Sequence, residues 1–291
     1  MYIETPKAMG QMANAPLAFV LAQVRFSEQS SEFTHRLQHL LDQLEPGRFM
    51  PAQPQPIQRI TFNLSAEGTL PTPLEVGLAY HLVRKDAQVM VRVAPDSLTL
   101  AVTDYENSTK FRELWFPMVG CLGAAELTGP VQRLGLRYVD FILPTGNRIP
   151  EDYVVGPWSL LDFPKIPGAK DRPSLHVSLQ EIEFDQGRMR LQFHRGYGKP
   201  MLPMDLGGML EPQLGREHNG LSAIIDTDRW IEGSWTHDDP AIAKLFSSMH
   251  TDLGNVFKAM MSSHAKVEWE QEQAGKVAQA TPIALPTGET A

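Results

Sequence analysis

The sequence is poor in cysteine and in long apolar runs, and each shortage excludes a class of protein. Among its 291 residues Cys121 is the single cysteine, so no internal disulfide can form, and the chain suits a reducing compartment. No apolar run approaches the roughly 20 residues that span a bilayer, so we expect no insertion into a membrane. These two shortages together predict a cytoplasmic protein.

The sequence also lacks an excess of positive charge. Its formal net charge of −8 opposes binding to nucleic acid or to an anionic membrane surface, because both rely on clustered Lys and Arg. Residues 1–15 lack the apolar core of a signal peptide, and we expect them to form an N-terminal extension. With 42% hydrophobic residues, the chain can still bury a large core.

Signatures of the common catalytic and metal sites are absent as well. The motifs H-E-x-x-H, paired C-x-x-C, G-x-x-x-x-G-K-[ST] and G-x-S-x-G do not occur. His35 and His39 have the i, i+4 spacing of metal ligands on a helix, but no third ligand follows at a recognisable spacing. We therefore expect no cofactor and no metal, and an enzyme is the less favoured class.

What the sequence does contain is an ordered series of strand and helix patterns. Residues 16–129 predict, in order, a strand at 16–26, a helix capped by Ser30, strands at Ile57–Leu64 and Tyr80–Arg84, a hairpin at 89–102, and a helix at Ser108–Glu126. Residues 130–270 predict a strand at Leu134–Leu143, a weak helix at Glu151–Leu161, strands at Leu175–Phe184, Arg188–His194 and Leu221–Asp226, and a long helix after Asp239-Pro240.

The order of elements in the second half repeats that of the first. It predicts an α+β fold in which antiparallel sheet is packed by helices, as a tandem β-α-β(3-4)-α duplication. That order is similar in topology to the saddle of the TATA-binding protein. A single α+β sheet without internal symmetry is the alternative. Leu134–Leu143 carries apolar residues on both of its faces, which predicts a central strand.

Two segments fall outside this pattern. Gly196–Gly220 is long and rich in Gly, Pro and Met, which is typical either of a binding loop or of a mobile excursion. Residues 271–291 have no periodic apolar face and are expected to form a disordered tail.

Arg137 is the most informative single residue, because a buried guanidinium on a central strand requires a partner. We expect Asp140 or Glu181 to supply it, and we favour a structural ion pair over an anion-binding role. Arg137, Tyr138, Asp140 and His250 are the candidate ligand-binding residues.

Asp226 and Asp228 close a predicted strand and are weak candidates for a divalent-cation site. Carboxylates at such a place more often solvate a strand end or cap a turn, which is the favoured interpretation. Together with His250 they would also be the catalytic residues if the protein were an enzyme. Cys121 lies in a helix beside core residues, so we expect a buried structural thiol.

Four features occur together along the chain: a Pro16-Leu17 strand ending in Val24-Arg25-Phe26, a helix with Trp115 and Pro117, a Leu136-Arg137-Tyr138 strand, and an Asp226-x-Asp228 strand before a helix with Leu245, His250 and Phe257. In this combination the chain resembles a sporadically distributed family of uncharacterised bacterial proteins, over residues 16–270. Members of that family usually carry Asn where this sequence has Asp140. The resemblance implies scattered inheritance and no particular chemistry, as expected for an accessory component of a mobile or phage-defence system.

Three functions remain open on the sequence. The leading hypothesis is a non-enzymatic bacterial interaction or adaptor protein that binds another protein. The second is a small-ligand or nucleotide sensor, with a pocket between sheet and helices near Arg137. The third is an enzyme that uses Asp226, Asp228 and His250. The sequence leaves open whether the chain forms a homo-oligomer.

Overall fold

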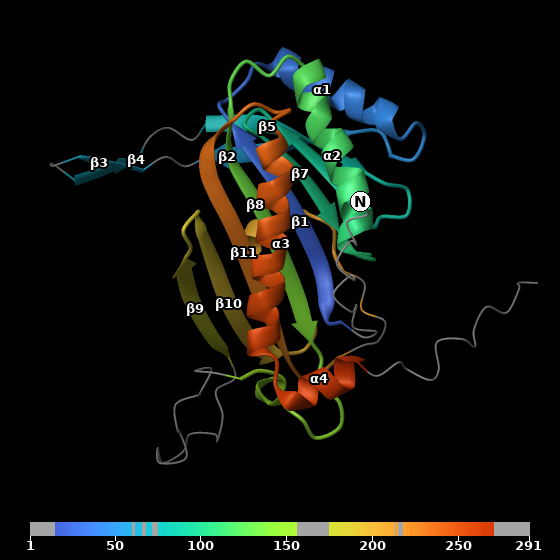
Figure 1. The fold of residues 1–291 in the computed structure, drawn as a ribbon, viewed down its shortest axis with the longest axis vertical. Helices are drawn as coiled ribbons and strands as arrows, with labels where there is room; N and C mark the ends of the chain where they lie inside the picture. The colour runs from blue at the N-terminus through green and yellow to red at the C-terminus, as the bar shows by residue number, and fades with distance from the viewer. Residues whose placement is uncertain are drawn as a thin grey trace, which may run out of the picture.

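A computed structural model of the chain describes residues 15–59, 62–65, 68–71, 75–155, 175–212, 214 and 218–270. Within them, one antiparallel sheet has nine strands in the order β2-β5-β6-β7-β1-β8-β11-β10-β9 (Figure 1). The strands are β1 (Leu17–Phe26), β2 (Gln53–Arg59), β5 (Glu75–Val83), β6 (Val89–Ala94), β7 (Ser97–Val102), β8 (Val131–Ile142), β9 (His176–Glu183), β10 (Arg188–Tyr197) and β11 (Leu221–Trp235). β3 (Phe62–Ser65) and β4 (Gly68–Pro71) pair with each other in a separate two-stranded sheet.

The helices are α1 (Ser31–Leu44), α2 (Ser108–Ala124), α3 (Pro240–Met260) and α4 (Ser263–Glu270), with short 3-10 helices η1 (Pro150–Tyr153) and η3 (Met204–Leu206). Figure 1 shows α1, α2 and α3 on one side of the sheet, with α3 running along β8 and β11. The predicted α+β fold with an antiparallel sheet packed by helices is confirmed.

The two predicted halves, 16–129 and 130–270, meet in the middle of this sheet. β1 pairs with β8, and Ala22 lies opposite Leu136. Outward from β1 the strands are β7, β6, β5 and β2, and outward from β8 they are β11, β10 and β9. The first half therefore contributes one strand more to the sheet than the second, and strand order alone does not establish common descent of the halves. The duplication therefore stays a prediction.

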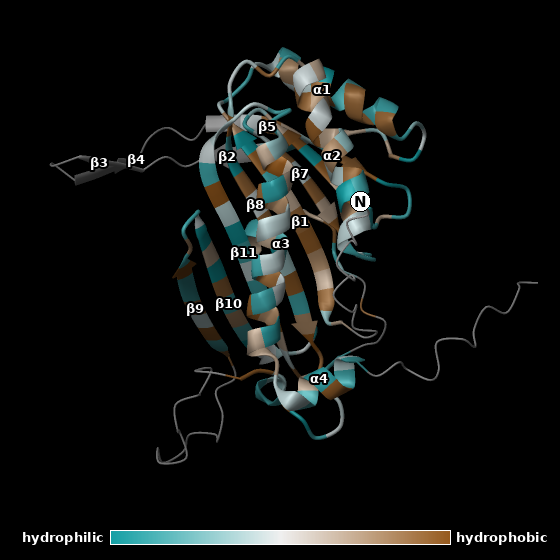
Figure 2. Ribbon diagram, viewed as in Figure 1, coloured by the Kyte–Doolittle hydropathy of each residue, from teal (hydrophilic) through white to brown (hydrophobic). Residues whose placement is uncertain are grey.

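The main core fills the space between the helices and the sheet. Figure 2 shows many apolar residues, coloured brown, along the strands beneath α2 and α3. Leu134 and Leu136 of β8 point into this core, and so do Trp115 of α2 and Phe246 of α3. Alternate residues of β8 point to the other side of the sheet, where Val139 and Phe141 join a second apolar cluster. β8 is thus buried on both faces, as the sequence predicted for this strand.

Each long helix begins at a polar side chain that accepts a hydrogen bond from the first turn. Ser30 accepts from the Phe33 backbone N–H at 3.4 Å, and Asn107 accepts from that of Lys110 at 2.9 Å. Asp239 accepts from the Ala241 N–H at 2.8 Å. These caps satisfy donors that a helix N-terminus otherwise leaves unpaired, and those at Ser30 and Asp239 are the start signals from which the sequence predicts the first and last of these helices.

Several boundaries differ from prediction. The strand expected at Ile57–Leu64 is divided between β2 and β3, and β2 carries two prolines, which a strand tolerates at a sheet edge. The last strand continues nine residues beyond Asp226, to Trp235. The short helix α4 is not among the predicted elements. The helix expected at Glu151–Leu161 is a 3-10 helix, η1, in its described part, and residues 156–161 lie outside the described residues.

The predicted extension and tail also fall outside the description. Residues 1–14 and 271–291 are not among the described residues, so disorder of the tail stays a prediction. The loop between β10 and β11 is described except for residues 213 and 215–217. It lies against the sheet face that α1, α2 and α3 leave free, with Leu206 and Leu210 buried beside Phe19 and Phe141. The described part of this loop is therefore packed against the sheet.

Candidate functional site

The alternation of side chains along β8 separates the candidate residues onto two faces of the sheet. Tyr138 and Asp140 point toward the helices, and Arg137 points to the opposite side. We call that opposite side the open face, because among the described residues no α-helix packs on it. Its members include Gln23 of β1, Arg137 of β8 and Asp228 of β11, which follow from the strand registers.

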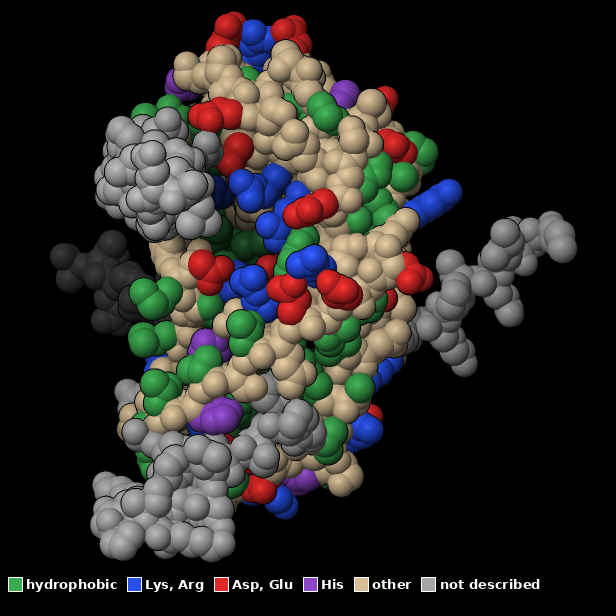
Figure 3. Space-filling model, turned by 90° about the vertical axis from the view of Figure 1, so that its left-hand side faces the viewer, with side chains coloured by type: hydrophobic (Ala, Val, Ile, Leu, Met, Phe, Trp, Pro, Cys, Tyr) green, Lys and Arg blue, Asp and Glu red, His purple; other side chains and the backbone are tan. Residues whose placement is uncertain are grey.

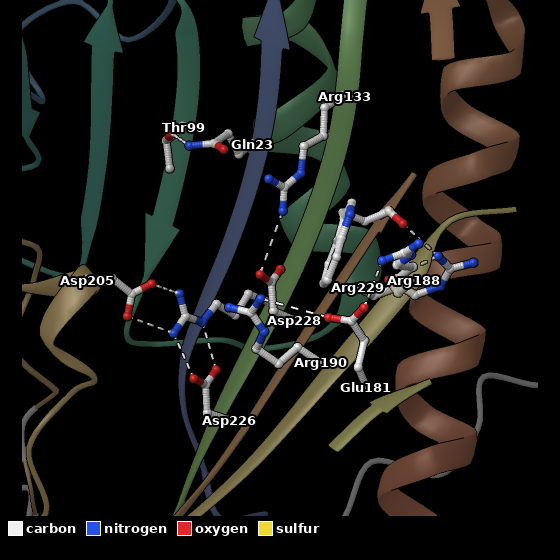
Figure 4. Close-up of polar contacts among 12 residues, drawn as sticks. Gln23, Thr99, Arg133, Glu181, Arg188, Arg190, Asp205, Asp226, Asp228 and Arg229 are labelled. Atoms are coloured by element: carbon white, nitrogen blue, oxygen red, sulfur yellow. Dashed lines mark hydrogen bonds and ion pairs between the residues drawn. The ribbon is translucent and has the colours of Figure 1, made fainter. Parts of the chain in front are cut away.

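Arg137 of the open face lies between two carboxylates, those of Asp205 and Asp226, which are labelled in Figure 4. Its Nε and one Nη each donate to Asp226 at 2.7 Å. Both Nη atoms also donate to Asp205, which belongs to η3 in the loop before β11. These four hydrogen bonds use four of the five N–H groups that a guanidinium carries. An anionic ligand at Arg137 would have to displace Asp205.

The two carboxylates differ in exposure and hold Arg137 charged. The Asp226 side chain is 1% exposed and that of Asp205 is 65% exposed. Burial by itself would lower the pKa of Arg137, but the hydrogen bonds to Asp226 and Asp205 raise it above its usual value. Burial would raise the pKa of Asp205, and the Arg137 hydrogen bonds lower it instead. The cluster is a charged ion pair at the centre of the sheet.

The partners of Arg137 are not the expected ones. The sequence predicts Asp140 or Glu181, and the structure has Asp226 and Asp205 in their place. Asp140 points to the other face of the sheet because it is an odd number of residues from Arg137 along an extended strand. Glu181 lies on the edge strand β9 and pairs with Arg188 at 3.0 Å.

Beside this ion pair, a tryptophan on the open face is flanked by two arginines. The guanidinium carbon of Arg133 is 4.9 Å from the centre of the Trp230 ring, and that of Arg190 is 5.8 Å from it. Arg133 also lies 3.9 Å from Asp228, and Arg190 lies 3.9 Å from Glu181. Figure 3 shows basic and acidic side chains gathered together on one side of the molecule, with hydrophobic ones around them.

Arg133 is incompletely paired within this group. Burial lowers the pKa of Arg133, although the nearby Asp228 acts in the opposite direction. Its Nε is buried, and the described residues offer it no hydrogen-bond acceptor. Arg92 on β6 is similar: burial lowers its pKa, and its buried Nε has no hydrogen-bond acceptor among the described residues. A half-buried cation with an unused donor is stabilised when a binding partner supplies an acceptor.

On the helix side, Tyr138 and His250 are in direct contact. The Tyr138 hydroxyl lies 2.7 Å from Nδ1 of His250 in α3, and 3.5 Å from the hydroxyl of Tyr105. Burial raises the pKa of Tyr138 well above its usual value and lowers that of His250, so both groups are neutral near pH 7. This chain of hydrogen bonds joins α3 to the central strand.

Asp140 is fully buried on the same face. Burial, and then the negative charge of Asp226, raise the pKa of Asp140 to about 8. The carboxyl group is therefore largely protonated at neutral pH. An Asn at this position would keep similar size and polarity without a titrating group.

The structure does not bring together the three residues of the enzyme hypothesis. Asp226 points to the open face, where it is held by Arg137, and His250 contacts Tyr138 on the helix face. Asp228 lies near Arg133 on the open face. Across the described ranges, no group of three or more His, Cys, Asp and Glu side chains is placed to hold a metal ion. Ligand binding by Arg137, Tyr138, Asp140 and His250 stays a prediction.

A pocket of about 200 Å³ lies on the open face rather than between the sheet and the helices. Its walls come from β2, β5 and β6 and from residues 208–210 of the loop that carries η3. His81 and the side chains of Gln53 and Gln55 supply polar groups, and Met50, Met90 and Met209 supply apolar ones. Burial, and then the charge of Arg92, lower the pKa of His81, so this lining is neutral at pH 7.

Sequence reasoning missed Trp230 and Asp205. Trp230 follows Asp226 and Asp228 at a spacing of two, so extending the alternation beyond the predicted strand end would have placed all three on one face. Asp205 gives no such signal, because it lies in an irregular segment and reaches Arg137 across 68 residues of sequence.

No family model matches the chain, and no curated protein matches it. In the part of the chain that the structure describes, no helix has both the length and the hydropathy needed to cross a lipid bilayer.

Proposed function

We propose that this protein is a non-enzymatic binding protein whose open face recognises another protein. The observation that carries the proposal is the Arg133–Trp230–Arg190 group, in which a half-buried guanidinium, whose Nε has no acceptor among the described residues, lies over a half-buried tryptophan. Arg and Trp are the residue types that most often dominate the energy of protein interfaces.

The distribution of charge favours a protein partner over a nucleic acid. Arg190 and Arg188 alternate with the carboxylates of Glu181 and Asp228 on the same face. A polyphosphate backbone would meet repulsion from those carboxylates, whereas a protein surface with its own mixed charges can match both signs. The net charge of −8 likewise disfavours the binding of a nucleic acid.

The proposed setting follows from the sequence. A single cysteine suits the cytoplasm. The resemblance to a sporadically inherited bacterial family supports an adaptor that serves as an accessory component of a mobile or phage-defence system. A host strain that carries such a system is the natural source for a search for the partner.

The test is affinity purification from the native host followed by mass spectrometry, with two matched double variants. Arg188→Ala with Arg190→Ala removes two exposed cations from the open face. Arg36→Ala with Lys110→Ala removes two exposed, ion-paired cations from the helices. We expect one protein to be retained by the wild type and by the helix variant, and to be lost from the open-face variant.

Equal retention by both variants would overturn the proposal, as would a partner that only the helix variant loses. Both pairs of residues are exposed, so neither variant should change the melting temperature by more than a few degrees.

The pocket under residues 208–210 favours a second candidate function, the binding of a small ligand. Its volume of about 200 Å³ is below the usual range for drug-sized ligands, and its neutral lining of His, Gln and Met side chains suits a small uncharged molecule. Native mass spectrometry of protein purified from the host tests this directly. A bound mass that disappears in Met90→Trp, which would fill the pocket, supports a ligand, and a spectrum of bare chain contradicts it.

A further inference from the structure

The two edges of the sheet differ in how they are protected. A strand at an edge presents a row of unpaired N–H and C=O groups that another strand can use. β2 forms one edge and contains Pro54 and Pro56, which have no N–H to donate. β9 forms the other edge, and among the described strands it pairs only with β10. Its sequence, HVSLQEIE, contains neither proline nor lysine.

The side chains of β9 on the open face are apolar where edge strands usually carry charge. Val177 is 54% exposed and Leu179 is 62% exposed, and Leu175, just before the strand, is 67% exposed. Glu181 follows on the same face, but its carboxylate is held by Arg188 of the neighbouring strand at 3.0 Å. An edge with which no further described strand pairs, and which carries an accessible apolar stripe, is a surface suited to pairing with another strand.

We infer that this edge pairs with the same edge of a second copy of the chain, antiparallel, about a two-fold axis at Ser178. This register places Val177 of each copy opposite Leu179 of the other, so the two exposed apolar residues cover each other twice. Ser178 of one copy then lies opposite Ser178 of the other, and Glu181 of each copy lies opposite Leu175 of the other, so no carboxylate lies opposite another. A single self-complementary strand is sufficient for such an interface.

The pairing joins the two sheets into one and continues the open face across the axis. It does not depend on the proposed function, and it can be measured on the purified chain alone. Because each copy carries a net charge of −8, the copies repel each other at long range, and added salt screens that repulsion. The affinity of the two copies for each other should therefore increase as the salt concentration is raised, as expected of an apolar interface between two acidic chains.

Disulfide trapping tests the register. In the proposed dimer the two Ser178 Cα atoms are about 4.5 to 5.5 Å apart, within the reach of a disulfide. The two Gln180 Cα atoms are displaced by four residues along the strands, roughly 13 Å, which is beyond that reach. Ser178→Cys should form a covalent dimer under mild oxidation, and Gln180→Cys should not. The native Cys121 is buried, and the wild type serves as its control.

A covalent dimer from Gln180→Cys with none from Ser178→Cys would overturn the register. The association itself is tested by sedimentation over a range of concentrations. Leu179→Lys should weaken dimerisation by about tenfold or more, since it places two cations across the axis from apolar side chains. The control Val267→Lys, on the exposed side of α4, should leave it unchanged. A wild type that stays monomeric, or a dimer indifferent to Leu179→Lys, would refute the inference.

Discussion

Arg137→Met removes the guanidinium at the centre of the open face and keeps most of the side-chain length. It leaves the carboxylate of Asp226, which is 1% exposed, without its two hydrogen bonds of 2.7 Å. Breaking a buried ion pair by removing one partner costs about 3 to 5 kcal/mol. The lost contact with Asp205 adds little, because that side chain is 65% exposed, and such pairs contribute about 0 to 1 kcal/mol.

Urea denaturation of three variants separates these contributions to the free energy of unfolding. Arg137→Met should lose about 3 to 5 kcal/mol, and Asp205→Asn no more than about 1 kcal/mol. The double variant Arg137→Met with Asp226→Leu should regain most of the loss, because it replaces the buried pair by apolar side chains and leaves no unpaired charge.

The reasoning would be refuted by an Arg137→Met protein as stable as the wild type. In that case the guanidinium of Arg137 would stabilise the folded state no more than the methionine side chain does, as expected of an arginine whose role is to bind an anion. Asp205→Asn as damaging as Arg137→Met would also contradict it, because the loop contact would then carry the stability assigned to Asp226.

Three further results are expected. Because burial raises the pKa of Asp140 to about 8, the folded state holds a proton that the unfolded state releases near pH 4. The free energy of unfolding should therefore fall as the pH rises from about 4 to 8, and Asp140→Asn should flatten this part of the pH–stability curve. Gly187→Ala should lower the melting temperature far more than Gly146→Ala. Both glycines have positive φ, but a Cβ at Gly187 would lie 2.0 Å from a backbone oxygen, whereas a Cβ at Gly146 would meet nothing within 4 Å. In denaturant, Phe246→Ala should lower the free energy of unfolding by about 3 to 5 kcal/mol and Phe257→Ala by less, because Phe246 is 4% exposed and Phe257 only half-buried. Equal losses in the two variants would contradict the packing of α3.

Local signals in the sequence were sufficient for most of the fold. The polar cap at Ser30 and the Asp239-Pro240 start located the first and last long helices, since capping depends on residues within one turn. Apolar residues on both sides of β8 identified a central strand, because only a strand covered on both faces can bury both sets. Phe257 shows the limit of this reasoning: it has the helical spacing of the buried residues of α3, and the structure places it at the edge of the core, stacked on Trp269 of α4.

The candidate site depends on contacts that no local pattern specifies. Arg137 was recognisable as a buried cation, but its partner Asp226 is 89 residues away in the sequence and is brought near by the β8–β11 register. A shift of that register by one residue would turn Asp226 to the helix face, so the partner could be named only once the pairing was known.

The most direct test of the open face is oxidative footprinting of side chains in the complex with the partner that the host purification recovers. The account predicts that Trp230 becomes protected from oxidation when the partner binds, while Val267 on α4 and Leu44 at the end of α1, both exposed in the free chain, react as before. Protection of Val267 or Leu44 with no change at Trp230 would place the partner on the helices and contradict the account.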